Sequence, residues 1–146
     1  MAINPTVGTR TSLTVTGLGT LASATYVLSN AVTPDTNNPV DSIVEVICAT
    51  TNTPTGNKQV VVFIKPSLDG TNYTSGPESG TTTTDEPDLI LLGVIPMNTA
   101  STDHKQMWSV GQRLGFVPYS YKLVFKNDLG VALTSASVYT SEISIA

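Results

Sequence analysis

Hydrophobic and polar positions alternate along much of this chain. The clearest example is the segment 119–126, in which Tyr119, Tyr121, Leu123 and Phe125 occupy every second position. A period of two places successive side chains on opposite faces of a β-strand. The pattern predicts about eight strands and no helix beyond one turn that Ser101 or Thr102 would cap. The other strand-like segments are residues 13–16, 21–28, 42–50, 59–65, 89–96, 106–110 and 136–145.

Stretches rich in Gly, Pro, Asn and Asp separate these segments, most clearly at residues 33–39, 52–57 and 66–72. Many short strands joined by such turns are typical of an all-β antiparallel sandwich, either jelly-roll-like or immunoglobulin-like. A chain of 146 residues is long enough to bury a core without disulfides or a metal. We therefore expect one β-sandwich domain over residues 12–146. Residues 1–11 are expected to form a flexible arm, because Pro5, Gly8 and Thr9 limit regular structure there.

Two of the predicted strands, residues 42–50 and 59–65, are apolar on both faces. In the second of these, Val60, Val62 and Ile64 share one face and Val61 and Phe63 the other. A strand of this kind is buried on both faces. In a small sandwich the outer face needs cover, either from a long loop or from another subunit. Oligomerisation is therefore one of the two explanations that the pattern allows.

The composition is poor in charge and rich in hydroxyl groups. Charged residues make up 12% of the chain, against about 25% in an average protein, and 23 residues are Thr. The seven Lys and Arg residues are scattered and the net charge is −4, which argues against direct contact with nucleic acid. The chain has no run of about 18 apolar residues that would cross a membrane, and residues 1–5 lack the pattern of a signal peptide. A surface of hydroxyl groups is typical of a domain that lies against neighbours, and we expect assembly in a cytoplasm.

The residues that carry chemistry do not combine into a recognisable site. His104 and Cys48 each occur once, too few for a His/Cys zinc site, and no Gly-x-Ser-x-Gly motif is present. His104 is expected in a solvated loop and Cys48 in a core strand. The acidic group at residues 85–88 is interpreted as a solvated turn, with a Ca²⁺ site or acid–base catalysis as alternatives. We therefore expect no enzymatic activity, no cofactor and no metal.

Candidate interface residues lie in two places. Trp108 is the only tryptophan, and Trp, Tyr and Arg are enriched at binding hot spots, although a core position is the alternative for Trp108. The second place is the N-terminal arm, which could add a strand to a neighbour's sheet edge. The candidates are Ile3, Pro5, Val7, Trp108, Arg113, Phe116 and Tyr119.

Several segments together resemble small structural proteins of tailed bacteriophages. They are residues 21–26, 57–62, 67–73, 89–93 and 121–127, which match as strand-and-turn patterns, so that no functional residue is carried over. That group in turn resembles head decoration (cement) proteins, which are commonly trimeric β-sandwiches. The resemblance implies a location in the virion and the major capsid protein as a partner.

These observations lead to one functional expectation and two alternatives. The chain is expected to be a capsid decoration protein on the outer head surface, between capsid subunits, attached through one end of the sandwich and the arm. A homo-oligomer is expected, with a trimer favoured, and no direct contact with nucleic acid or membrane. The alternatives are a tail, neck or head-fibre component and a carbohydrate-binding β-sandwich for host adhesion.

Overall fold

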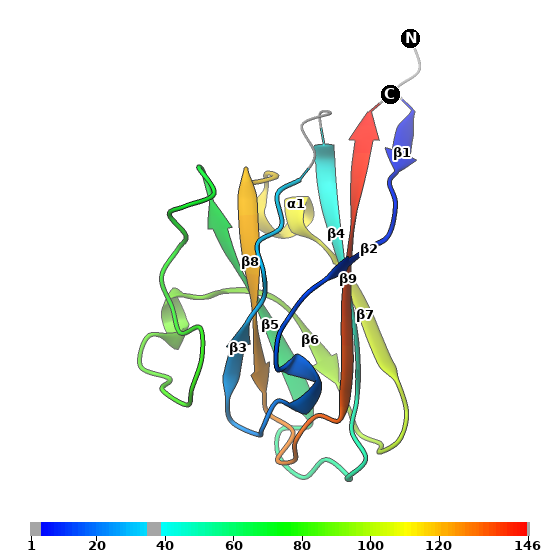
Figure 1. The fold of residues 1–146 in the computed structure, drawn as a ribbon, viewed down its shortest axis with the longest axis vertical. Helices are drawn as coiled ribbons and strands as arrows, with labels where there is room; N and C mark the ends of the chain where they lie inside the picture. The colour runs from blue at the N-terminus through cyan, green and yellow to red at the C-terminus, as the bar shows by residue number, and fades with distance from the viewer. Residues whose placement is uncertain (1–3, 35–38, 146) are drawn as a thin grey trace.

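Two antiparallel β-sheets pack face to face in this protein, as the computed structural model of residues 4–34 and 39–145 shows (Figure 1). Sheet A has the order β1-β9-β4-β7, with β2 also paired to β9, and sheet B has the order β3-β8-β5-β6. The predicted all-β sandwich is thereby confirmed. The strands are β1 (Pro5–Val7), β2 (Thr11–Leu13), β3 (Tyr26–Leu28), β4 (Pro39–Ala49), β5 (Gln59–Ser67), β6 (Ile90–Pro96), β7 (His104–Ser109), β8 (Ser120–Asn127) and β9 (Ser135–Ile145).

The connectivity of β2 to β9 is that of a jelly roll. The first four of these strands pair with the last four in reverse order: β2 with β9, β3 with β8, β4 with β7 and β5 with β6. These four strand pairs form one long antiparallel ribbon. The ribbon folds over on itself, so that β4 also pairs with β9 and β5 also pairs with β8. Of the two sandwich types left open by the sequence, this order of strands matches the jelly roll.

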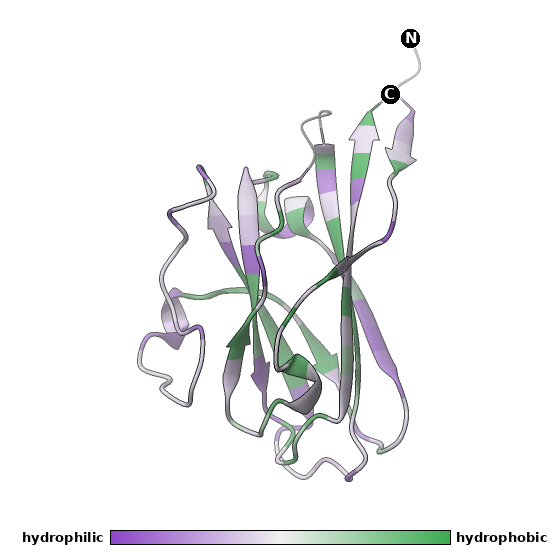
Figure 2. Ribbon diagram, in the orientation of Figure 1, coloured by the Kyte–Doolittle hydropathy of each residue, from purple (hydrophilic) through white to green (hydrophobic). Residues whose placement is uncertain are grey.

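The core lies between the sheets and is built from alternating positions of the central strands. Val44, Val46 and Cys48 of β4 point inward and are fully buried, as are the inward residues of β5 and β8. Figure 2 shows hydrophobic residues concentrated along these central strands, whereas the long loop outside sheet B is mainly neutral or hydrophilic. Ser42 and Tyr121 join the two sheets through a buried hydroxyl pair 2.7 Å apart. Burial raises the pKa of the Tyr121 phenol, which therefore stays protonated.

A loop of the same chain covers the outer face of sheet B. Leu89, at the end of the long loop between β5 and β6, packs on Val61 and Phe63 of β5 together with Tyr26 and Val124. This second cluster buries the outward apolar residues of β5. Of the two kinds of cover that the sequence left open, a loop and a subunit, the loop is the one that lies on this face.

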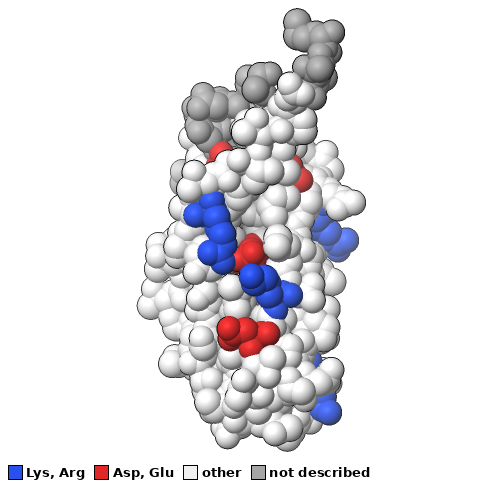
Figure 3. Space-filling model, turned by 90° about the vertical axis from the view of Figure 1, so that its right-hand side faces the viewer, with Lys and Arg blue, Asp and Glu red and all other residues white. Residues whose placement is uncertain are grey.

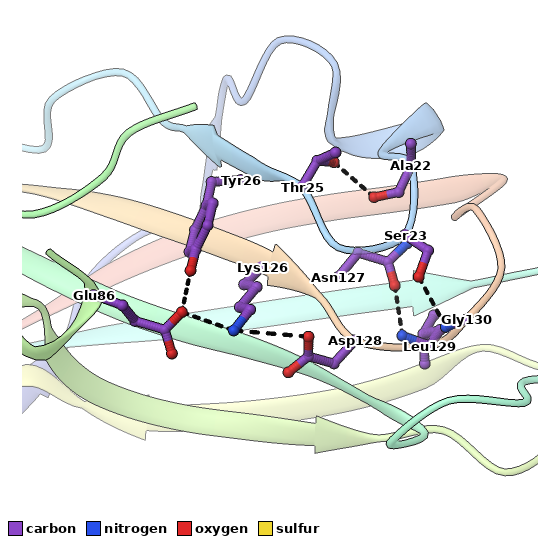
Figure 4. A network of polar contacts seen from close by, with 10 residues as sticks. All are labelled: Ala22, Ser23, Thr25, Tyr26, Glu86, Lys126, Asn127, Asp128, Leu129 and Gly130. Atoms are coloured by element: carbon purple, nitrogen blue, oxygen red, sulfur yellow. Dashed lines mark hydrogen bonds and ion pairs between the residues drawn. The ribbon is translucent and has the colours of Figure 1, made fainter. Parts of the chain in front are cut away.

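A polar clamp holds this loop to the sheet (Figure 4). Glu86 lies in the short 3-10 helix Glu86–Asp88 and accepts hydrogen bonds from the Tyr26 hydroxyl and, at 2.7 Å, from Lys126 Nζ. Lys126 also lies 3.9 Å from a carboxylate oxygen of Asp128. Earlier in the same loop, Glu78 pairs with the buried ammonium group of Lys65, a residue of β5. The loop is therefore tied to sheet B by apolar packing and by ion pairs at separate points.

Three local expectations are wrong. The helical turn lies at α1 (Val110–Leu114) and not near Ser101, because the Ser109 hydroxyl caps it and Asp41 of β4 holds its first turn. His104 lies at the start of β7, partly buried opposite Cys48, and not in a solvated loop. Regular structure also occurs near the N-terminus, since β1 and β2 both pair with β9, despite Pro5, Gly8 and Thr9.

Candidate interaction surfaces

Exposed hydrophobic side chains gather at one end of the sandwich. This end, which we call the apical end, is formed by β1, the start of β4, the end of β5, the start of β8 and the end of β9. At this end the hydroxyl of Ser42 in sheet A lies 2.7 Å from that of Tyr121 in sheet B, and Val32 and Tyr121 exchange backbone hydrogen bonds beside it. Among the described residues, six of the eight exposed large hydrophobic side chains lie here. They are Val7, Val40, Leu68, Phe116, Tyr119 and Ile145, and the other two are Leu91 and Met107.

Leu68 is the most exposed of these side chains, at 85%, and a rigid turn presents it. The carboxylate of Asp69 accepts hydrogen bonds from the backbone N–H groups of Thr71 and Asn72, both at 2.8 Å. The Ser67 hydroxyl donates a further hydrogen bond to this carboxylate at 3.0 Å. The hydrogen bonds from Asn72, Thr71 and Ser67 hold the pKa of Asp69 well below its usual range. The turn is thus ordered before any partner arrives, which lowers the entropic cost of binding.

Phe116 and Tyr119 follow the short helix α1. Gly115 ends this helix in a left-handed conformation, with φ of 81°, and its N–H donates to the Gly111 carbonyl at 2.7 Å. Only glycine adopts this conformation at little cost, so Gly115 sets the direction in which the chain leaves the helix. The two aromatic side chains that follow are 49% and 59% exposed. Aromatic side chains, Trp and Tyr above all, are enriched at binding hot spots, so these two exposed rings are candidate anchors.

Leu68 and Phe116 border a hollow of about 490 Å³ at the apical end. Pro66, Tyr73 and Thr74 also line it, and most of the lining surface is apolar. The Tyr73 hydroxyl lies 2.9 Å from that of Ser120, and the Lys122 ammonium lies 4.6 Å from the centre of the Tyr73 ring. The hollow has the size and the character to receive apolar side chains of a partner protein.

The N-terminal strand lies at the same end. Pro5 and Val7 belong to β1, which pairs with the last residues of β9, and every side chain of β1 is exposed. Val7 is 69% exposed. Four of the seven predicted interface residues, Pro5, Val7, Phe116 and Tyr119, therefore share the apical end, while Ile3 lies outside the described residues.

Trp108 and Arg113 lie elsewhere, at the flank where β6 approaches β7. Trp108 is partly buried and packs against the core and against Gly93, and Arg113 donates a hydrogen bond to the Leu91 carbonyl. Sequence reasoning did not select Leu68, although an apolar residue in the middle of the turn sequence 66–72 was a usable signal. A turn needs no large apolar side chain for its own conformation.

The described residues contain no group of three or more His, Cys, Asp or Glu side chains that could hold a metal ion. The acidic residues 85–88 do not converge on one point, because Glu86 turns toward Lys126 and Tyr26. Over the same part of the chain, no helix is long and apolar enough to cross a membrane.

No protein family and no curated protein matches the chain. Among solved structures, a chain from the structure of infectious bursal disease virus, Gt strain, is 14% identical, with a TM-score of 0.22. The match covers 99% of this chain and 42% of the viral chain, so this chain spans less than half of its length. A similarity at this level shows neither family nor function. The structure itself shows the fold, a jelly-roll β-sandwich with exposed apolar side chains at one end.

Proposed function

We propose that this chain is a structural protein of a phage virion, most specifically a capsid decoration protein. It binds the outer head surface between capsid subunits through its apical end. The observation that carries the proposal is the concentration of exposed apolar side chains, an apolar hollow and the strand β1 at one end of the sandwich. Exposed apolar groups gathered in this way mark interaction sites in water-soluble proteins.

Three further observations support a binding role. The phage resemblance of residues 21–26, 67–73 and 121–127 suggests a virion component. The jelly roll is an architecture used by viral capsid domains, and it is also used by lectins, so the fold by itself is only an analogy. The Asp69 turn and the capped helix α1 hold their apolar side chains ready, which favours stable attachment over transient contact.

Capsids that lack the protein provide the decisive experiment. Purified protein is added to such capsids and the particles are imaged by electron cryomicroscopy. We expect density at regular lattice sites, with the apical end against the capsid. Binding confined to the tail or neck would favour the alternative virion location, and an absence of binding to particles would contradict the proposal. Binding of a defined sugar on a glycan array would favour the carbohydrate-binding alternative.

Substitutions at the apical end test which surface attaches. Leu68→Lys and Phe116→Lys each place a charge in the apolar surface, and we expect each to weaken capsid binding at least tenfold. Thr51→Lys adds the same charge in an exposed turn at the opposite end of the sandwich and serves as the control. If Leu68→Lys and Phe116→Lys bound capsids as tightly as the control Thr51→Lys, the apical end would not be the attachment surface.

A further inference from the structure

The outer face of sheet A carries a shallow apolar hollow of about 350 Å³. Ile43 of β4, Tyr139 and Ile143 of β9 and Val7 of β1 line it, and the first three are only partly buried. Met107 of β7 also lines it and is 58% exposed. Figure 3 shows a short line of charged groups in the middle of this side of the molecule, with uncharged surface around it. The volume lies near the lower limit for ligand pockets, about 300 Å³, and therefore suits a single large apolar side chain.

Two cations meet one carboxylate at the edge of this hollow. Glu45 accepts hydrogen bonds from Arg10, at 3.0 Å from Nε, and its second oxygen lies 4.0 Å from Lys105 Nζ. The carboxylate is only 12% exposed, whereas the side chains of both cations are 51% exposed. The nearest acidic residue along β4, Asp41, is turned to helix α1, where it accepts a hydrogen bond from Gly111 N–H at 2.8 Å. A partner arriving from solvent therefore meets the two cations first, and the group of three carries one surplus positive charge.

The charges on sheet B are arranged in the opposite way. There a single cation, Lys126, serves two carboxylates, those of Glu86 at 2.7 Å and of Asp128 at 3.9 Å. The apolar outer face of sheet B is already buried under Leu89 and its loop. In a chain with a net charge of −4, the surplus positive charge thus stands on the sheet face that this loop leaves open.

Arg10 is held in place before any partner arrives. Its guanidinium lies 3.3 Å above the centre of the Tyr139 ring, which forms part of the hollow. Stacking on this ring and the hydrogen bonds to Glu45 fix the guanidinium beside the apolar lining. A guanidinium binds a carboxylate with two parallel hydrogen bonds, and a binding group that is already ordered lowers the entropic cost of binding.

We propose that the outer face of sheet A binds an acidic segment of another protein, which places one large apolar side chain in the hollow and a neighbouring carboxylate on Arg10 and Lys105. Charge complementarity favours this occupant over a second copy, since both copies would bring the same surplus positive charge to the contact. One surplus charge is also too few for nucleic acid, whose binding depends on many phosphate contacts. The face borders the apical end at Val7 but is not needed for attachment there, so the inference goes beyond the proposed function.

A random library of short peptides displayed on yeast tests what this face binds. The unaltered protein and the variant Lys105→Glu are used as separate baits, and circular dichroism checks that the variant is folded. We expect the unaltered protein to select peptides in which Asp or Glu stands next to a large apolar residue, and the variant not to select them. The inference would be overturned if no peptide were selected above background, or if the selected peptides had no excess of acidic residues.

Calorimetric titration of a selected peptide then locates the site. Lys105→Glu and Met107→Glu each place a carboxylate beside the hollow and should weaken binding by about tenfold or more, because like charges then face each other. Lys58→Glu is the matched control, since it makes the same change of charge as Lys105→Glu at an exposed position outside this face. Leu68→Lys, at the apical end, should also leave peptide binding unchanged. Equal losses for Lys58→Glu and Lys105→Glu, or a loss for Leu68→Lys alone, would contradict the inference.

Discussion

At the scale of single residues, the Glu86 carboxylate illustrates how burial and hydrogen bonding compete. Partial burial would raise the pKa of Glu86, but hydrogen bonds from Lys126 and Tyr26 outweigh it and lower that pKa below its ordinary value. Burial, together with the bond to Glu86, raises the pKa of Tyr26 to about 12. Near neutral pH the clamp therefore consists of a carboxylate, an ammonium group and a neutral phenol.

Glu86→Gln should lower the free energy of unfolding at pH 7 by about 1 kcal/mol, since the clamp is partly exposed and its ion pair is screened by water. Because the folded pKa of Glu86 is lowered, its contribution is complete above the pKa of the unfolded chain, about 4.3. The contribution is lost as the pH falls through the folded pKa. Urea unfolding of both proteins should show the difference at pH 7 and none near pH 2. A difference that persists at pH 2 would mean that the substitution disturbs packing and not charge.

Gly93 is required by its contact with Trp108. A Cβ atom at residue 93 would overlap the indole ring, most closely at Nε1, so the ring would have to move. We expect Gly93→Ala to destabilise the protein by about 1–3 kcal/mol, the usual range for overpacking. Trp108 is the only tryptophan, and its fluorescence maximum should shift to longer wavelength as the ring becomes more exposed.

Gly19→Ala is the control for this substitution, because a Cβ atom there would meet its nearest neighbour at an ordinary 3.7 Å. Its fluorescence and stability should stay close to those of the unaltered protein. If Gly93→Ala behaved in the same way, the close contact between β6 and β7 would not be present in solution.

At the scale of elements, β1 differs from the other strands because its side chains contribute no burial. Pro5, Thr6 and Val7 are exposed, and the segment is held by backbone pairing with β9 and by the hydrogen bond from Gly8 N–H to the Glu142 carbonyl, 2.7 Å long. A strand held in this way can be removed at little cost to the fold. It can also pair with the edge of a neighbouring sheet, since backbone hydrogen bonds make few demands on sequence.

Removal of residues 1–8 should therefore leave the melting temperature nearly unchanged while weakening attachment to capsids. The truncation keeps Arg10 and β2, so the ion pair with Glu45 and the pairing at residues 138–140 remain. Scanning calorimetry and co-sedimentation with capsids measure the two effects separately. Unaltered co-sedimentation would exclude the N-terminal strand from attachment, whereas a large fall in melting temperature would show that β1 supports the fold.

The elements that could be predicted from sequence are those whose side chains carry their own burial pattern. The strand at residues 59–65 is recognised because Val60 to Ile64 are apolar on both faces. Two elements depend on distant partners and leave no local pattern. Strand β1 exists because β9 offers a free edge, and helix α1 is held by Asp41, 70 residues before Gly111. The sequence predicts that the strands at residues 42–50 and 59–65 both need cover on their outer faces, but it does not show that the loop ending at Leu89 covers only the second, since a covering loop leaves no pattern in the strand itself.

At the scale of the whole molecule, the jelly roll joins parts of the chain that are far apart in sequence. The pairing of β2 with β9 and of β3 with β8 needs both halves of the chain to be present. Folds dominated by such distant contacts fold slowly, because a large loop must close before its contacts can form. We expect the core to open as one cooperative unit and not strand by strand.

Cys48 offers a direct measurement of this cooperativity. Its thiol is fully buried, and burial raises its pKa to about 12, so the reactive thiolate is scarce in the folded protein. Labelling by a thiol reagent should be negligible for the native protein at neutral pH. With increasing denaturant, labelling should rise together with the loss of circular dichroism. Labelling well before that transition would reveal local opening of β4 and would contradict a single cooperative unit.

The pairing of Pro5 with Ile145 has a practical consequence for protein engineering. A peptide attached near either of these residues starts at the apical end, where it would lie on the surface that we propose for attachment. The loops at the opposite end, residues 50–58, 98–103 and 128–134, are better sites for displaying a foreign sequence. For the same reason a short linker could join the two ends into a circle. The circle could be reopened within residues 50–58, giving a permuted chain with every strand pairing intact.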